Sequence, residues 1–138
     1  EPTPAARQVA ELPNVVHFAL DRAALSAKSR QVLDRIAAAL RQYPEMTVTL
    51  YGYTDYRASV AYNQALAARR AASVERYLQQ QGIALSRMAR VSKGEQNQQS
   101  DPEHRRATAL SRRVELVFVQ DGLEIQPHAQ TEDLQLER

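Results

Sequence analysis

The sequence predicts a single α/β domain, a small two-layer βαβαββ sandwich with two helices packed on one face of a mixed sheet. The stretch "MTVTLYG" (residues 46–52) alternates between apolar and polar side chains, which is typical of a strand with one buried face. Two longer stretches, residues 26–43 and 59–81, instead repeat their apolar residues with a helical period. Because each strand–helix–strand step needs a crossover connection, we expect both helices to lie against the sheet.

The first half of the chain begins with a predicted linker, residues 1–14, which is rich in Pro and Ala and has no clear period. The β-branched and aromatic run "VVHFA" (residues 15–19) predicts the first strand. Ser26 is a suitable N-cap for the first helix, and Pro44 ends it. The apolar face of this helix consists of Val32, Leu33, Ile36, Leu40 and Tyr43.

The second half predicts a helix from near Ser59 to about Gln81, with Gly82 as its C-terminal cap. A weaker strand, a polar loop and a helical turn are expected to follow at residues 87–92, 93–102 and 103–110, before a confident strand at residues 113–119. Asp121 and Gly122 predict a turn into a short added strand, residues 123–125, followed by a mobile, mildly acidic tail. The expected organisation is a linker (1–14), one domain (15–120) and a C-terminal extension (121–138).

Composition excludes several classes of function. The chain has no cysteine, so thiol catalysis, disulfides and thiolate metal sites are excluded. No apolar run approaches the roughly 18 residues of a membrane-spanning helix. We therefore expect membrane contact only through a barrel, lipid anchor or helix outside this chain, before Glu1.

The histidines do not predict an active site. His17, His104 and His128 fall on a strand, in the polar loop and in the tail, and no two of them have the i, i+4 spacing of a helical metal site. His17 is opposite in phase to Val16 and Phe18, which predicts a solvated side chain. We expect no enzymatic activity, no metal and no cofactor.

Three arginine doublets, at residues 69–70, 105–106 and 112–113, raise the question of nucleic-acid binding. The formal net charge is only +2, from 18 basic and 16 acidic residues, and no aromatic residues alternate with the basic ones. We expect no nucleic-acid partner. The second doublet is interpreted as a solvated loop and the third as an ion-paired end of the sheet, with Asp21 or Asp55 as candidate partners.

The helical period places the two arginines of the first doublet, Arg69 and Arg70, on different faces of the helix. Val60, Ala67, Ala71, Val74 and Leu78 form one narrow stripe that should face the sheet. Asn63 and Arg70 lie together on a flank of that stripe, and Arg69 faces solvent. A guanidinium at the rim of the core needs a partner, and Asp55, in the loop that precedes the helix, is the obvious candidate.

Two interpretations of this pair are open. Asp55 and Arg70 form a structural ion pair, or they flank a gap and hold a zwitterion between them. In the second case Asp55 takes an ammonium group and Arg70 clamps a carboxylate through two parallel hydrogen bonds. Spacing alone does not choose between them.

Residues 52–83 resemble the core signature of the OmpA-like peptidoglycan-binding domain, of the OmpA C-terminal, Pal and MotB type. That signature reads G-H-T-D-x-x-G, then Y-N-x-x-L-S-x-x-R-A-x-x-V, a leucine and G-I. Here it is matched by Gly52-Tyr53-Thr54-Asp55, Tyr62-Asn63, Leu66, Arg70-Ala71, Val74, Leu78 and Gly82-Ile83. "VHFALDRAAL", "VSKGEQ" and "SRRVEL" extend the resemblance from residue 16 to residue 116.

The resemblance implies a non-covalent cell-wall anchor in the periplasm, tethered to the outer membrane or cell envelope. Domains of this family bind the diaminopimelate of the peptidoglycan stem peptide, and the residues that hold its amine and carboxylate fall here on Asp55 and Arg70. The resemblance also implies a pocket lined by Asp21 and Leu66. The other ligand-binding candidates come from the matched motifs: Phe18, Thr54, Ala58 and Asn63.

Four positions depart from the family pattern: Tyr53 replaces histidine, Ala58 glycine, Ala67 serine and Ser111 asparagine. Ala58 bears most on binding, because a methyl group would narrow the pocket mouth if the site needs a positive φ or a close backbone approach. The alternative is therefore an OmpA-like fold with weakened wall binding that acts as a periplasmic protein–protein interaction module. Its partner would be another envelope protein.

Overall fold

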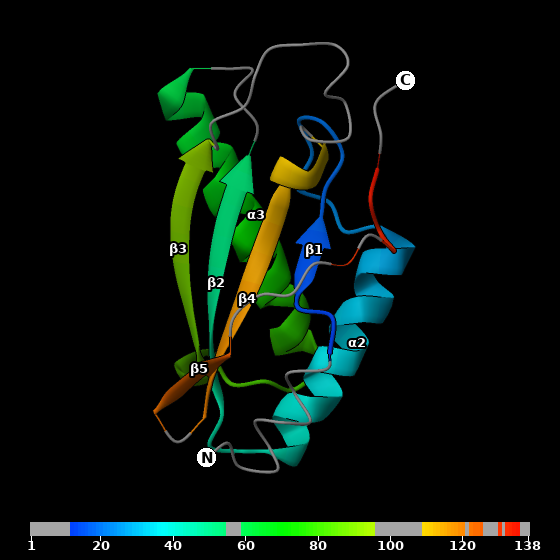
Figure 1. The fold of residues 1–138 in the computed structure, drawn as a ribbon, viewed down its shortest axis with the longest axis vertical. Coiled ribbons are helices and arrows are strands. Elements are labelled where there is room, and N and C mark those ends of the chain that lie inside the picture. The colour runs from blue at the N-terminus through cyan, green and yellow to red at the C-terminus, as the bar shows by residue number, and fades with distance from the viewer. Residues whose placement is uncertain are drawn as a thin grey trace.

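The computed structural model describes residues 12–54, 59–95, 109–120, 122–125, 130 and 132–135 (Figure 1). The elements in chain order are β1 (Val15–His17), α2 (Ala27–Gln42), β2 (Thr47–Thr54), α3 (Val60–Gln80), the 3₁₀ helix η1 (Leu85–Arg87), β3 (Met88–Glu95), β4 (Arg113–Gln120) and β5 (Leu123–Ile125). The predicted order of strands and helices is confirmed, and β3 continues three residues into the stretch expected as a loop.

The strands form one mixed sheet in the order β1-β4-β2-β3, and β5 pairs with the free part of β4. Only β2 and β3 are parallel, and the other pairs are antiparallel. Alternate residues of β2, such as Val48 and Leu50, belong to the same buried cluster as Ile36 of α2 and Val74 of α3. Both helices therefore cover one face of the sheet, as the sequence predicts.

Local signals fix the two helices where the sequence places them. Ser26 caps α2 by accepting a hydrogen bond from the Ser29 amide at 3.1 Å, and Ser59 caps α3 through the Tyr62 amide at 3.1 Å. At the other end of α3, Gly82 adopts φ +95°, the left-handed conformation that a glycine after a helix provides.

The stripe predicted to face the sheet is confirmed for Ala67, Ala71, Val74 and Leu78, which are all buried. The prediction is wrong for Val60, whose side chain is 64% exposed. Figure 1 shows the reason: the first turn of α3 extends past the ends of the neighbouring strands. At that turn the stripe no longer has the sheet to pack against.

The two predicted extensions contribute to the domain. In the linker, Asn14 is buried and exchanges two hydrogen bonds with Leu116 of β4, at 2.9 and 3.1 Å. In the tail, Asp133 is buried and bonds to His17. The prediction of a mobile tail is therefore wrong for residues 130 and 132–135, which we call the C-terminal strap.

The prediction of a solvated His17 is also wrong, because its exposed fraction is only 2%. The alternation of β1 correctly separates His17 from Val16 and Phe18. It cannot reveal that an acid 116 residues later in the chain covers it. His17 Nδ1 lies 2.9 Å from Asp133 Oδ1, and the His17 amide donates to Asp133 Oδ2 at 2.7 Å.

Acid is expected to weaken this contact. Burial raises the pKa of Asp133, but hydrogen bonds from His17, Ser29 and Gln130 outweigh it, so the pKa is lowered from its ordinary value of 3.8. A carboxyl group with a lowered folded-state pKa contributes stability above its unfolded pKa, and that contribution is lost as pH falls through the folded value.

Urea unfolding at a series of pH values checks this prediction. The parent should exceed Asp133→Asn in free energy of unfolding at pH 7, and the difference should narrow below about pH 4. A difference that stays constant between pH 6 and 2.5 would contradict the assignment.

Candidate functional site

The candidate site lies where β2 ends, α3 begins and the segment after β1 passes beside them. Of the predicted site residues, Phe18, Thr54, Asn63, Leu66 and Arg70 are buried, and Asp21 is exposed. Asp55 and Ala58 lie outside the described residues. The structure places the residues that flank them, Thr54 at the end of β2 and the N-cap Ser59.

Arg70 is fully buried, so it lies in the interior and not at the rim of the core as predicted. Its guanidinium donates to three backbone carbonyls, those of Ala19, Arg22 and Tyr53, at 3.0, 2.9 and 3.1 Å. The same group stands 5.4 Å from the centroid of the Phe18 ring. Arg70 therefore connects α3 to the segment after β1 and to the end of β2.

This network holds the guanidinium in one orientation. Nε, Nη1 and Nη2 each donate to a different carbonyl, so rotation of the planar group would break several hydrogen bonds at once. A fixed guanidinium suits a structural ion pair and a carboxylate clamp equally, since both require a defined fork geometry. The three hydrogen bonds give Arg70 a structural role, and Asp55, its predicted partner in the ion-pair interpretation, lies outside the described residues.

Asp21 is brought to the same place by an unusual backbone conformation. Its φ is +56°, a left-handed value that aspartate tolerates better than most residues. Its carboxylate accepts a hydrogen bond from the Tyr62 hydroxyl of α3 at 3.4 Å. The exposed Asp21 therefore lies beside the first turns of α3, in which Asn63 and Leu66 are buried.

Tyr53, which replaces the family histidine, faces away from the helices. Arg113 lies 4.0 Å from the centroid of its ring and pairs with Glu115 at 2.7 Å. Burial, followed by the charge of Glu115, raises the pKa of the Tyr53 hydroxyl above its ordinary value of 10.0. Arg113, in the doublet at residues 112–113, thus forms an ion pair at the end of the sheet, with Glu115. Asp55, one of the two predicted partners, lies outside the described residues.

Arg112 is the functional candidate that sequence reasoning missed. It is buried, and its guanidinium donates to the carbonyls of Phe18 and Gln135, at 2.9 and 2.5 Å. One arginine thus joins the residue beneath Arg70 to the C-terminal strap. An arginine doublet at the start of a strand gives no sign that one member points inward.

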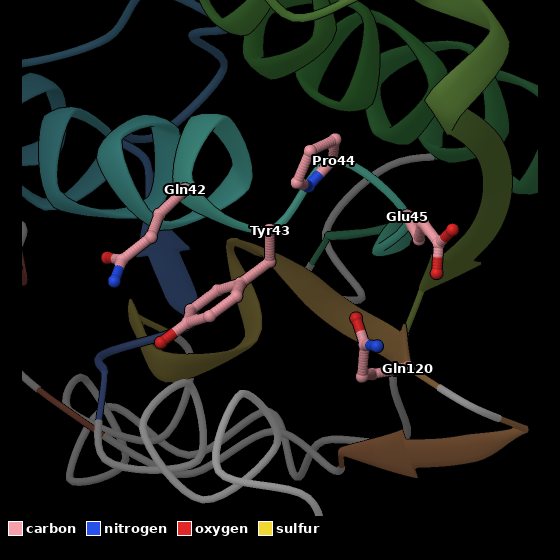
Figure 2. Close-up of a pocket in the computed structure, with 5 residues that line it drawn as sticks. All are labelled: Gln42, Tyr43, Pro44, Glu45 and Gln120. Carbon is pink, nitrogen blue, oxygen red and sulfur yellow. The ribbon is translucent and has the colours of Figure 1, made fainter.

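The opposite end of the sheet has a shallow cavity of ≈ 330 Å³. Figure 2 shows its lining around the turn between α2 and β2: Gln42, Tyr43, Pro44, Glu45 and Gln120. None of the predicted site residues that the structure describes borders it. Over the described ranges, no group of three or more histidine or acidic side chains is arranged to hold a metal ion. Among those same ranges, neither helix has the length and apolar character needed to cross a bilayer.

Comparison with known proteins places these observations in a family. The model described as "OmpA family" matches residues 17–112. The chain is 38% identical to the peptidoglycan-associated lipoprotein of Agrobacterium fabrum over 81 residues, which cover 59% of this chain and 46% of the relative. It is 36% identical to outer membrane protein A of Bordetella avium over 102 residues, 74% of this chain and 53% of the relative.

The fold is similar to solved structures as well. The crystal structure of the peptidoglycan-associated lipoprotein from Burkholderia pseudomallei superposes with a TM-score of 0.71 at 28% identity, covering 77% of this chain and 90% of the other. The chain spans about half the length of the two curated relatives above. The C-terminal strap lies beyond the residues that the family model matches.

Proposed function

This chain belongs to the OmpA family, and we propose that it binds peptidoglycan reversibly through the diaminopimelate of the stem peptide. The observation that carries the proposal is the match over residues 17–112, which includes the signature stretch and both clamp positions. Relatives from Agrobacterium fabrum and Burkholderia pseudomallei are both named peptidoglycan-associated lipoproteins, which agrees with this ligand.

In this proposal Asp55 accepts hydrogen bonds from the ammonium group of diaminopimelate, and Arg70 donates two parallel hydrogen bonds to its carboxylate. The three carbonyls around Arg70 support this role, because a guanidinium already held in place loses little freedom when the ligand arrives. Asp21 adds a second carboxylate beside the first turns of α3. No bond is made or broken, so the domain is a recognition module and not an enzyme.

The cellular role follows from the ligand. A domain that holds the cell wall without a covalent bond anchors whatever it is attached to, and we place it in the periplasm, tethered to the outer membrane or cell envelope. Relatives named outer membrane protein A and outer membrane porin F are consistent with that location.

Titration of the domain with a diaminopimelate-containing muropeptide by calorimetry tests the clamp. Asp55→Ala and Arg70→Ala should each weaken binding about tenfold or more, since a hydrogen bond to a charged group contributes roughly 1.5–3 kcal/mol. Arg69→Ala is the matched control, because Arg69 is exposed on the same helix turn and its guanidinium lies 5.9 Å from the centroid of the Tyr62 ring.

Folding of each variant is checked by circular dichroism, and Arg70→Lys is the substitute if Arg70→Ala does not fold. Equal affinity for the parent and a folded Asp55→Ala would contradict the clamp. So would a loss of binding by Arg69→Ala as large as that by the Arg70 variant.

One observation favours the alternative, an interaction module with weakened wall binding. Arg70 is fully buried and is already engaged with the backbone of two other segments, which suits a purely structural arginine. A folded parent that binds no muropeptide would select this alternative, with another envelope protein as the partner.

A further inference from the structure

Among the described residues, side chains close the outer edge of β1, and no further strand pairs with it. On its inner side, β1 pairs with β4. On its outer side, the Val15 carbonyl accepts a hydrogen bond from Gln130 Nε2, and the His17 amide donates to Asp133 Oδ2 at 2.7 Å. The C-terminal strap thus satisfies backbone groups that an edge strand would otherwise leave open.

Asp133 is the centre of this contact. Besides the His17 amide, its carboxylate accepts from His17 Nδ1 at 2.9 Å, Ser29 Oγ at 2.8 Å and Gln130 Nε2 at 2.7 Å. These donors come from β1, from α2 and from the strap itself. A buried carboxylate with donors on every side docks in one position, because any displacement would leave a charge buried without its hydrogen bonds.

A second contact involves Gln135, two residues after Asp133 in the strap. The Gln135 carbonyl accepts from Arg112 Nη2, and Arg112 Nε donates to the Phe18 carbonyl at 2.9 Å. The Phe18 amide in turn donates to the Arg112 carbonyl at 2.7 Å. The strap therefore fixes His17 directly, through Asp133, and Phe18 indirectly, through Arg112.

The same short segment, residues 17–22, holds Arg70 from its other side. Phe18 contributes the ring beneath the guanidinium, and Ala19 and Arg22 contribute two of its three carbonyl acceptors. Asp21 lies between them with its left-handed backbone. Residues 17–22 are thus bound to the strap. They include two of the proposed ligand-binding residues, Phe18 and Asp21, and two of the carbonyls that hold Arg70.

We propose that the C-terminal strap positions the ligand site: by docking through Asp133 and Gln135, it fixes residues 17–22 and so orients Arg70 and Asp21. This inference rests on the proposed function. Asp133 is a positioning residue that does not touch the ligand. When the strap is undocked, residues 17–22 must be ordered as the ligand binds. Ordering costs about 0.5–1.5 kcal/mol for each immobilised side chain, so we expect affinity to fall about 3- to 10-fold.

The test compares the parent with Asp133→Ala and with a chain that ends at Ala129. Glu132→Ala is the matched control, since it breaks only the neighbouring Arg35–Glu132 pair, whose side chains are 45% and 57% exposed. Affinity for the muropeptide is measured at 10 °C, where partly destabilised variants remain folded. Backbone hydrogen exchange over residues 15–22 is measured on the same samples.

We expect both strap variants to bind 3- to 10-fold more weakly and to exchange faster over residues 17–22, with Glu132→Ala like the parent. A merely structural role would lower the melting temperature without changing the affinity of the folded protein, and that result would overturn the proposal. If the parent itself binds no muropeptide, the proposed function fails. Hydrogen exchange alone then tests whether the strap fixes residues 17–22. Faster exchange over residues 17–22 in Asp133→Ala would then support the strap, and unchanged exchange would overturn it.

Discussion

Replacement of Gly52 by alanine is expected to destabilise the domain by about 3 kcal/mol or more, the upper part of the range for overpacking. Gly52 lies in β2 where the strand passes close to α3. A Cβ atom there would stand 2.1 Å from the Ala67 carbonyl oxygen and 2.9 Å from the Ala67 carbonyl carbon. Both are backbone atoms of a helix, so neither can rotate aside as a side chain could. The strand and the helix would have to separate.

Urea unfolding of Gly52→Ala beside Gly82→Ala checks this reason. Gly82 has a positive φ of +95°, and no neighbouring atom of the described residues lies within 4 Å of the Cβ position, so its substitution carries conformational strain without a clash. We expect a loss of roughly 1–3 kcal/mol there. A smaller loss for Gly52→Ala than for Gly82→Ala would contradict the close contact between β2 and α3.

The elements that the sequence predicts best are those specified by local signals. The alternation in β2, the serine caps of α2 and α3, and Gly82 after α3 each act within a few residues, and each occurs where expected. The pairing of β2 with β3 and β4 then brings the end of β2 beside α3, which positions Thr54 against the site. The proposed ligand rests on the resemblance to the family and not on any local pattern.

The features that the sequence did not predict depend on long-range contacts. Helical periodicity gives the direction of Arg70 but not its depth, and three carbonyl acceptors from two other segments allow a charged group to lie in the interior. His17 is covered by Asp133, an acid that follows Glu132 in a stretch without periodicity. Val60 lies on the face of α3 that packs against the sheet, but the sheet does not extend as far as the first turn of the helix. Asp55 and Ala58 stay predictions, since they lie between the described ranges.

Discrimination between two stem peptides is the second large effect that we expect. Diaminopimelate carries a carboxylate on the same carbon as its distal amine, and lysine has the amine alone. If Arg70 forms two hydrogen bonds to that carboxylate, a lysine-containing muropeptide loses both of them. Two charge-assisted hydrogen bonds contribute about 3 kcal/mol or more, which corresponds to about 100-fold in affinity. The ammonium contact with Asp55 is common to both ligands and does not contribute to the difference.

Calorimetric titration of the parent domain with the two muropeptides, identical except at this residue, tests the central claim most directly. The account predicts measurable binding of the diaminopimelate peptide and binding of the lysine peptide that is about 100-fold weaker. Arg70→Lys should lose most of this discrimination, because a lysine ammonium is a point charge without the planar fork that matches a carboxylate. Equal affinity of the parent for the two peptides would contradict a site built around Arg70 and the ligand carboxylate.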